Sequence, residues 1–483
     1  EEEEEEEEED VEDAAIVVVG GGVSGMAAAL TAARSLPPSE RESSRILLLE
    51  SSSELGGRVA SDVTEDGYVL DRGFAVFVEE YPSAREVLDL DELGLMRFDP
   101  GALVKQRGRM RLVKVADPLR RPGDLLAALT SEVGSILDKV ALVPLLFNVK
   151  TKSVEGLFAE EETDTMTCLR SRYGFSEEFV MDFFEPFFEG IFFCPLEQQS
   201  SRMFHFVMKM FTDGYSTLPT GGMGAVSAQL RSKVEAEGVE VRTSRSVASL
   251  RPEPDGTTTV ATGGAEYDRD RPVRARSVVI ATEAPSARRL LSTMDDFGFL
   301  ELSEDAGAPQ REVSCLYYAC GDDVPVRDPL IVLSGMREDR NTAPYPVNSV
   351  CFPSVVNPSY APEGGGHLCS VSVLREAAEA YEGRPEDLDR AVRAQLATWF
   401  PDHATSVRDG WELKGTYSIT NAQPGQFGCK VPANVHGGRD CGSFRGKELP
   451  RGVFICGDHV ATATLNGAIE SGMKAGKAAA KCV

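Results

Sequence analysis

The sequence predicts an α/β protein in which two domains are interleaved along the chain. Short runs of Ala, Ile, Val and Leu occur near the N-terminus, in the middle and at the C-terminus of the 483 residues, each beside a helix-like segment. Continuous apolar runs of this length are typical of parallel strands that are buried on both faces. Two blocks of mixed helical and β-like pattern separate them. One domain is therefore expected to be assembled from three separated blocks and the other from two.

The N-terminal block has the pattern of a βαβ unit. Ala14–Val19 is an apolar run that ends at glycine and predicts a strand, and the Ala-rich segment Met26–Ser35 predicts a helix. Leu36–Ser44 contains two prolines and predicts a loop, after which Arg45–Glu50 repeats the strand pattern. The crossover between the two strands is expected to be right-handed.

The remaining elements are predicted from the same periodicities. Pro385 near the first turn of one segment, followed by acidic residues, is an N-terminal helix signature. The predicted helices cover 118–150 and 165–210, both interrupted at prolines, and 221–238, 284–292, 385–400 and 466–480. The predicted strands cover 239–243, 277–282, 314–319, 368–374 and 452–456.

The charge and cysteine content exclude several classes of protein. The net charge is −27, and nine glutamates with Asp10 open the chain, so binding to nucleic acid phosphates is not expected. Residues 1–13 are predicted to be a disordered acidic extension, either a solvated low-complexity segment or a tail for a basic partner. Ten scattered cysteines are typical of a reducing intracellular compartment. Neither they nor the five histidines have metal-ligand spacing, so no metal is predicted.

A glycine-rich loop follows the first predicted strand. In Gly20-Gly21-Gly22-Val23-Ser24-Gly25, the first and third glycines of the G-x-G-x-x-G pattern permit the turn and the helix packing, and Gly22 gives a pyrophosphate access to backbone N–H groups. Glu50 ends the second strand 25 residues after Gly25, where an acid binds ribose hydroxyls and repels a 2′-phosphate. The block predicts a dinucleotide site that suits NAD or FAD and disfavours NADP.

Two further motifs favour FAD. Leu55-Gly56-Gly57-Arg58-Val59 offers backbone access and a guanidinium for a phosphate oxygen. Near the C-terminus, the strand ending at Cys456 leads into Gly457-Asp458, and a helix starts with Gly467-Ala468-Ile469. In this order the motifs resemble the amine oxidase and phytoene desaturase superfamily of flavoproteins. The resemblance implies that Asp458 binds the ribityl chain and that the amides of Gly467–Ile469 lie near the flavin N1/O2 edge.

The resemblance covers the chain after residue 13 and implies a Rossmann-like FAD-binding domain interleaved with an α+β substrate domain. The FAD-binding domain is expected to comprise residues 14–90, 215–290 and 445–483, and the substrate domain residues 91–214 and 291–444. The residues implied to contact FAD are Gly20, Gly22, Val23, Ser24, Gly25, Glu50, Ser51, Gly57, Arg58, Gly73, Phe74, Val247, Ala281, Thr282, Gly457, Asp458, Asn466, Gly467, Ala468 and Ile469.

Within the superfamily, Phe183–Phe193, Ser200–Phe204 and Leu218–Gly224 look like phytoene-desaturase-like oxidoreductases rather than amine oxidases. Amine oxidases of the superfamily have a lysine where this chain has Ser314 and an aromatic residue where it has Thr464. The resemblance therefore implies hydride transfer to flavin N5 from a hydrophobic, isoprenoid- or carotenoid-like substrate, with a quinone or oxygen as acceptor. Six phenylalanines of Phe183–Phe193 either line the substrate or form a helical core.

Several alternatives stay open from the sequence. One is a flavin amine oxidase; another is a non-catalytic subunit that retains FAD, or a protein-binding relative like the Rab escort and dissociation-inhibitor proteins. His459 is the candidate catalytic acid or base, against a polar structural contact, whereas His205 is expected in the core. The leucine-rich segment 118–146 predicts a core helix, with peripheral membrane association as the alternative. The resemblance and the missing initiator Met suggest a plastid.

Overall fold

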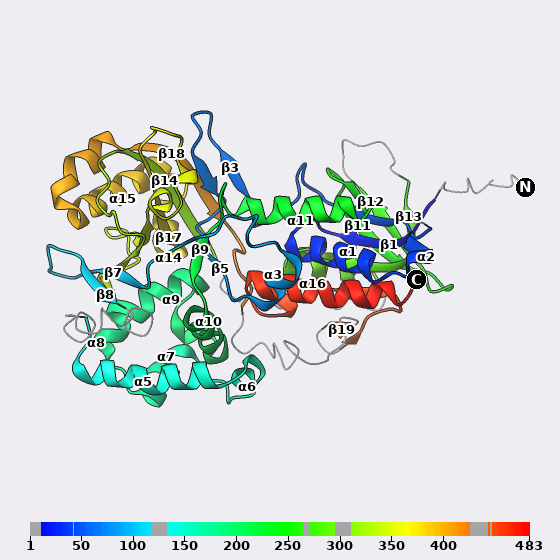
Figure 1. Ribbon diagram of the computed structural model, residues 1–483, viewed down its shortest axis with the longest axis horizontal. Helices are drawn as coiled ribbons and strands as arrows, with labels where there is room; N and C mark the ends of the chain where they lie inside the picture. The colour runs from blue at the N-terminus through cyan, green and yellow to red at the C-terminus, as the bar shows by residue number, and fades with distance from the viewer. Residues whose placement is uncertain are drawn as a thin grey trace, which may run out of the picture.

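The computed structural model describes residues 11–41, 43–116, 133–263, 271–294, 311–425, 443–444 and 447–483. Figure 1 shows an elongated molecule with two lobes, each built around one large sheet. The lobe that holds both chain ends contains the first sheet, and the lobe at the left of the view contains the second sheet and a helical layer below it.

The first sheet draws its strands from both ends and the middle of the chain. Its order is β10-β2-β1-β13-β12-β11, and β21 also pairs with β13. The strands β10, β2, β1, β13 and β21 pair in parallel, whereas β11 and β12 form an antiparallel hairpin at one edge. Their bounds are β1 Glu12–Val19, β2 Ile46–Leu49, β10 Glu240–Arg242, β11 Val247–Pro252, β12 Thr258–Thr262, β13 Val273–Ile280 and β21 Val453–Ile455.

The predicted βαβ unit is confirmed, with corrected ends. Strand β1 begins at Glu12, so the acidic extension predicted to reach residue 13 overlaps the strand, and residues 1–10 lie outside the described residues. Helix α1 (Val23–Ser35) begins three residues before the predicted Met26, because the extended Gly22 already serves as its N-cap. The predicted loop Leu36–Ser44 contains a one-turn helix, α2 (Pro38–Arg41), in which Pro38 supplies a pre-set first-turn φ.

Helix α16 (Leu465–Ala480) packs directly on α1, and Figure 1 shows the C-terminal helix beside α1 and α11 (Gly224–Ala236) on one face of the first sheet. A Cβ at Gly472 would lie 2.2 Å from the carbonyl oxygen of Ser24, and a Cβ at Gly476 would lie 2.2 Å from that of Ala28. The two helix backbones therefore touch, which only glycine at these positions permits.

The second sheet is mostly antiparallel and has the order β18-β14-β17-β16-β15-β7-β8. Its strands are β7 Gly101–Gln106, β8 Val113–Ala116, β14 Val313–Gly321, β15 Ile331–Gly335, β16 Val347–Cys351, β17 His367–Leu374 and β18 Glu412–Ile419. Helix α15 (Pro385–Trp399) covers one face, where Trp399 joins apolar side chains of β14, β16 and β17. The strands predicted at 314–319 and 368–374 and the helix at 385–400 are confirmed.

The remaining short strands and helices lie outside the two large sheets. They are β3 Ser61–Val63 with β4 Val69–Asp71, β5 Phe77–Val78 and β6 Met96–Arg97 with β9 Ser216–Leu218, β19 Ser443–Phe444 with β20 Lys447–Glu448, and the helices α3 Pro82–Val87, α12 Ala284–Leu291, α13 Pro353–Val356 and α14 Arg375–Ala378. The predicted helices at 221–238 and 284–292 and the strands at 239–243, 277–282 and 452–456 are confirmed within a few residues.

The interrupted helical pattern predicted over 165–210 is confirmed as a series of short helices, which belong to the helical layer of the second lobe. Its elements are α5 Ile136–Thr151, α6 Val154–Phe158, α7 Thr165–Thr167, α8 Glu177–Phe179, α9 Glu185–Phe192 and α10 Ser201–Asp213, with π-helical turns at Cys168–Tyr173 and Val180–Phe184. The chain turns at Gly174 and Phe193, both with left-handed backbone conformation. Of the predicted helix 118–150, residues 118–132 lie outside the described residues.

The phenylalanines of this layer form mainly a core. Phe184, Phe188 and Phe192 are buried on one side of α9 and its preceding turn, where Phe184 and Phe188 contact Phe204 of α10. Phe183, Phe187 and Phe193 are half-buried. The core interpretation of the six rings is therefore confirmed for three of them.

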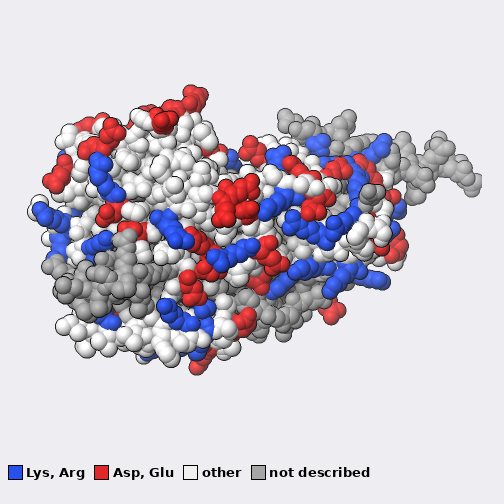
Figure 2. Space-filling view, in the orientation of Figure 1, with Lys and Arg blue, Asp and Glu red and all other residues white. Residues whose placement is uncertain are grey.

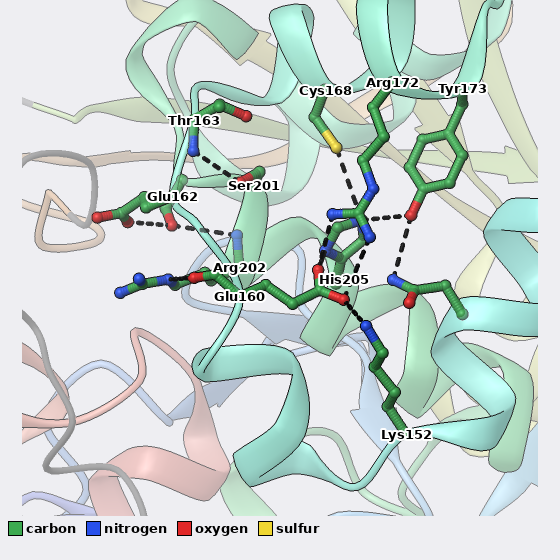
Figure 3. A network of polar contacts seen from close by, with 12 residues as sticks. Lys152, Glu160, Glu162, Thr163, Cys168, Arg172, Tyr173, Ser201, Arg202 and His205 are labelled. Atoms are coloured by element: carbon green, nitrogen blue, oxygen red, sulfur yellow. Dashed lines mark hydrogen bonds and ion pairs between the residues drawn. The ribbon is translucent and has the colours of Figure 1, made fainter.

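A buried polar network ties α5 to α10 (Figure 3). His205 Nε2 lies 2.9 Å from the Tyr173 hydroxyl, which accepts from Asn148 of α5, and His205 Nδ1 lies 3.2 Å from Glu160. Glu160 also pairs with Arg172 at 2.8 Å and with Lys152 at the end of α5. Burial opposes ionisation of Glu160, but the hydrogen bonds from Arg172 and Lys152 outweigh it and lower its pKa to about 2. His205 lies in the core as predicted, but only its Nε2 has a hydrogen-bond partner among the described residues, because its buried Nδ1 has none.

We predict that Gly476→Ala lowers the free energy of unfolding by about 1–3 kcal/mol, because the added methyl group forces α1 and α16 apart. Gly156→Ala is the matched control: this glycine is also helical, and its nearest neighbouring atom would lie 3.5 Å from the added Cβ. Urea unfolding of both variants compares them, and an equal loss of stability in the two would contradict the contact.

We also predict acid lability from His205. Burial lowers its pKa from 6.5 to about 4, so the unfolded chain binds a proton in this interval that the folded chain does not bind. The stabilisation is complete above pH 6.5 and falls, by at most about 3 kcal/mol, as the pH drops towards 4. His205→Gln should flatten the dependence of the unfolding free energy on pH in this interval. Parallel curves for wild type and His205→Gln would show that His205 does not cause the dependence.

Candidate functional site

The glycine-rich loop lies between the ends of β1, β2 and β13. Gly20 has φ +108° and donates its N–H to Leu49 O at 2.8 Å, and a Cβ on it would lie 2.9 Å from Ala281 O. A Cβ on Gly25 would meet Gly20 O at 1.8 Å. By contrast, nothing lies within 4 Å of the Cβ position of Gly22. The first and last glycines are thus required by the turn, and the middle one faces open space at the N-terminus of α1, where Val23 and Ser24 form the first turn.

The second glycine motif lies directly beside the first. Gly56 donates its N–H to Gly21 O at 2.9 Å, and the backbones of Gly22 and Gly56 form an isolated parallel bridge. Gly57 has φ +59°, and a Cβ on it would lie 3.5 Å from the Cα of Gly22. The two loops therefore present their backbones together, as a cradle for one phosphate-bearing ligand.

Arg58 and Asp458 meet at this cradle although 400 residues separate them in the chain. Arg58 Nη2 lies 2.8 Å from Asp458 Oδ1, and Nη1 donates to Ala422 O at 2.8 Å. Burial opposes ionisation of Asp458, but the charge and hydrogen bond of Arg58 outweigh it, and the pKa of Asp458 is held below its ordinary value. The pair places a permanent cation and an ionised carboxylate at the place where the N-terminal and C-terminal blocks join.

Glu50 links the end of β2 to the loop before β11. Its Oε2 accepts the Gly21 N–H at 2.6 Å, and its Oε1 accepts from Ser52 N at 2.8 Å and Ser51 Oγ at 3.1 Å. Arg245 N donates to the backbone carbonyl of Glu50 at 2.7 Å, which brings the chain leading to Val247 alongside. The acid, Ser51 and the start of β11 are therefore together at the carboxyl end of β2, as a nucleoside site requires.

The end of β13 completes this edge of the sheet. Ala281 N donates to Val19 O at 2.8 Å, and Ser24 Oγ lies 3.5 Å from Ala281 O. The hydroxyl of Thr282 is buried and has no hydrogen-bond partner among the described residues. A buried hydroxyl without a partner is costly, so its position beside the cradle fits a polar ligand.

The start of α16 lies one residue before the predicted one. The helix begins at Leu465, with Thr464 as N-cap, so the N–H of Gly467 is already bound by the Thr464 hydroxyl at 3.1 Å and that of Ala468 by the Thr464 carbonyl at 3.0 Å. The Asn466 side chain accepts from Ser83 N at 2.9 Å, and Ile469 lies in the core. The amides of Gly467 and Ala468 are thus bonded within the helix cap, and their place near the flavin N1/O2 edge stays a prediction.

Gly73 and Phe74 lie against the second sheet. Gly73 has φ +93°, and a Cβ on it would meet Ile419 of β18 at 2.9 Å, while Phe74 packs on the cluster that contains Cys315 and Tyr317 of β14. They follow the β3–β4 hairpin, which lies between the two lobes in Figure 1. Both residues are thus placed where the second sheet approaches the first lobe.

His459 lies over Gly457, next to Asp458. A Cβ on Gly457 would be 2.6 Å from its Nδ1, and both ring nitrogens are buried without a hydrogen-bond partner among the described residues. Burial lowers its pKa from 6.5 to about 4, with Asp458 opposing the shift. The imidazole is therefore neutral at pH 7, and because its protonated form is scarcely populated there, it is a poor general acid.

A match to the family described as flavin containing amine oxidoreductase extends over residues 27–483. The chain belongs to this family. The chain is therefore an FAD-dependent oxidoreductase. The cradle fits FAD. The paired glycine loops and Arg58 suit its pyrophosphate, and Asp458 and the unpartnered Thr282 hydroxyl suit its polar ribityl chain. No curated protein matched the chain.

Solved structures share the fold along nearly the whole chain. An oxidoreductase from Methanosarcina mazei is 17% identical with a TM-score of 0.63, and the match covers 95% of this chain and 98% of that one. A putative protoporphyrinogen oxidase from Exiguobacterium sp. 255-15 is 18% identical with a TM-score of 0.62, covering 96% and 97%. Cyclohexylamine oxidase from Brevibacterium oxydans IH-35A is 15% identical with a TM-score of 0.59, covering 97% and 98%.

Sequence reasoning missed a loop that connects the flavin cradle to the second lobe. Ala422 accepts from Arg58 and donates its N–H to Arg311 O at 2.8 Å. Gln423 Nε2 donates to Ala463 O at 2.9 Å, and Arg311 Nη1 reaches Gln199 Oε1 at 2.9 Å and Phe192 O at 3.1 Å. Arg311 is only 6% exposed. The sequence shows only an arginine shortly before a predicted strand. Its partners lie more than a hundred residues away in the chain, so the sequence does not indicate its role.

We predict that Arg311→Gln and Gln423→Ala weaken FAD binding by about tenfold, because the loop no longer holds Arg58 in place. Fluorescence titration of apoprotein with FAD measures the effect. Arg340→Gln is the matched control: Arg340 is also buried and binds Glu185 and Glu189 of α9, but it makes no contact with this loop. It should lower stability and leave FAD affinity unchanged. An equal loss of affinity in all three variants would mean that the loop does not act specifically.

Proposed function

We propose that this flavoenzyme is a dehydrogenase or desaturase that takes hydride from an activated C–H bond of a hydrophobic, isoprenoid- or carotenoid-like substrate. A quinone or oxygen would then reoxidise the flavin. FAD, when bound, supplies the hydride acceptor at N5. The chain's own residues hold the cofactor, orient the substrate and exclude water.

The observation that carries this proposal is the surroundings of Ser314. Its hydroxyl lies 3.0 Å from that of Ser418 on the neighbouring strand β18, and the residue is 3% exposed. A neutral, hydrogen-bonded pair of hydroxyls stands where the resemblance places the lysine of amine oxidases. No cationic side chain is therefore supplied at this position to assist amine chemistry.

Thr464 supports the same proposal. Its hydroxyl caps α16 by accepting the Gly467 N–H, so the side chain has a structural role where amine oxidases are expected to carry an aromatic residue. His459, the remaining candidate acid or base, is neutral at pH 7. These residues best suit a reaction in which the protein orients the substrate against the flavin and no side chain has to transfer a proton.

Amine oxidation is the second candidate. The family carries amine oxidoreductase in its description, and putrescine oxidase bound to putrescine shares the fold, at 16% identity with a TM-score of 0.58. An amine substrate would have to be recognised here without the lysine and the aromatic residue.

The proposed setting is a reducing intracellular compartment, and a plastid on the strength of the resemblance. Eight cysteines lie in the described residues; all are free thiols, and seven are buried. Nucleic acid is not a proposed partner, because the chain is strongly acidic. No metal is invoked, and no group of three potential ligands is found in the part of the chain that the structure describes.

We predict that, under anaerobic conditions, a detergent-dispersed polyene or isoprenoid such as phytoene bleaches the oxidised-flavin band of the holoprotein, whereas putrescine and cyclohexylamine do not. Dithionite serves as the control that the flavin is reducible. Amine-dependent bleaching with peroxide formation in air would instead establish the second candidate. Reduction by dithionite alone, with every organic compound inert, would point to a flavin-bearing subunit without turnover of these substrates.

A further inference from the structure

Helix α5 presents large apolar side chains to solvent. Five of them are between 61% and 78% exposed, and we call them the α5 surface: Ile136, Leu137, Val140, Val143 and Phe147. Their spacing puts them on one side of the helix over about 17 Å, at 1.5 Å per residue. The opposite side is also apolar and is packed into the protein through Ala141, Leu145 and Val149. A helix that is apolar on both sides normally lies in an interior, so a partner for the outer side is missing.

The position of α5 is fixed from behind. Asn148 donates to Tyr173 at 3.2 Å, and Lys152, which ends the helix, pairs with Glu160 in the network of Figure 3. At the other end, Ser135 and Asp138 form a capping box. The outer side of α5 is thus held rigidly in place and is not a frayed segment.

A basic turn lies next to the start of α5. The turn between β7 and β8 has the sequence Arg107-Gly108-Arg109-Met110-Arg111, and Met110 is 75% exposed. Arg107 and Arg109 line the same surface cavity as Ser135 and Asp138 at the beginning of α5, and Glu178 and Asp182 line it too. Arg107 pairs with Glu338 at 3.5 Å and with Asp339 at 3.2 Å. An exposed apolar tip between arginines therefore extends the α5 surface at one end.

The charges around this surface differ from those of the whole chain. The chain has a net charge of −27, yet the exposed residues of α5 include no acid and one base, Lys150. Figure 2 shows a largely uncharged margin along the lower edge, where α5 runs in Figure 1, with basic side chains at the left where β7 and β8 lie. The exposed side of α5 with its single base, and the exposed turn that carries Arg109 and Arg111 beside Met110, are complementary to an anionic, apolar partner, although Glu178 and Glu338 also lie at this end.

We propose that the α5 surface and the β7–β8 turn dock onto the surface of an anionic lipid bilayer. The helix would lie in the plane of the interface with its outer apolar side among the acyl chains and the arginines at the headgroups. No helix among the described residues is long and apolar enough to cross a membrane, so the contact is with one leaflet. A second copy joined through the same surface is the alternative that the test below separates from lipid.

The test is flotation of the full-length holoprotein with two kinds of vesicle, phosphatidylcholine alone and phosphatidylcholine with roughly a third phosphatidylglycerol. We expect binding to the anionic vesicles that weakens at high salt. The double variant Val143→Glu and Phe147→Glu should lower the bound fraction by about tenfold or more, and Arg111→Glu by a smaller factor. Val63→Glu is the matched control, because Val63 is 69% exposed on β3, outside the α5 surface, and should bind like wild type.

The flavin absorbance per chain shows that each variant is folded, so the result does not depend on the identity of the substrate. Absence of wild-type binding to either vesicle, or equal loss in the Val63→Glu control, would overturn the proposal. A wild-type dimer in sedimentation analysis that the double variant dissociates, without vesicle binding, would assign the α5 surface to a second copy instead. Turnover by a hydrophobic substrate without vesicle binding would leave the proposed function standing and remove the docking surface.

Discussion

The contact between α1 and α16 is the constraint on which the flavin site depends. Because Gly472 and Gly476 let α16 touch the backbone of α1, the strand β21 that precedes α16 is brought beside β13. Gly457 is held in turn by Ser471, whose hydroxyl accepts its N–H at 2.9 Å and donates to its carbonyl at 3.1 Å. Asp458 follows directly and pairs with Arg58 at 2.8 Å. A bulkier residue at either helix contact would shift the carboxylate as well as weaken the core.

The cofactor site and the second lobe are coupled through few groups. The loop at Ala422 and Gln423 touches Arg58 and Ala463 on one side and Arg311 on the other. Arg311 reaches the end of α9, the helix that carries the phenylalanine core. A movement of the helical layer would therefore displace Arg311 and, through the loop at Ala422, the guanidinium of Arg58 at the pyrophosphate cradle. The same layer contains α5, so the outer surface of the protein is linked to the flavin site through hydrogen-bonded contacts.

The sequence predicted the cradle well, because glycines at fixed spacing report a backbone geometry that few other residues allow. Gly20, Gly25 and Gly57 each meet a steric or left-handed requirement that the spacing had implied. The helix predicted over 466–480 is confirmed within one residue, because the capping hydroxyl of Thr464 sets its start at Leu465. Arg311 and Gln423 could not be found, as their roles arise from partners distant in the chain. Periodicity also could not place the outer side of α5, because apolar residues occupy both of its sides.

The distance along the chain between α1 and its partner helix has a consequence for biosynthesis. The Cys456 thiol and the Ser24 carbonyl, 432 residues apart, lie 4.0 Å from each other in the folded protein. A polypeptide emerges from the ribosome N-terminus first, so α1 and the glycine loop must wait for nearly the whole chain before their packing partner exists. Contacts of such long range also make folding slow. A complete flavin site is therefore a late product of the nascent chain, because Asp458 joins Arg58 only after the C-terminal block has been made.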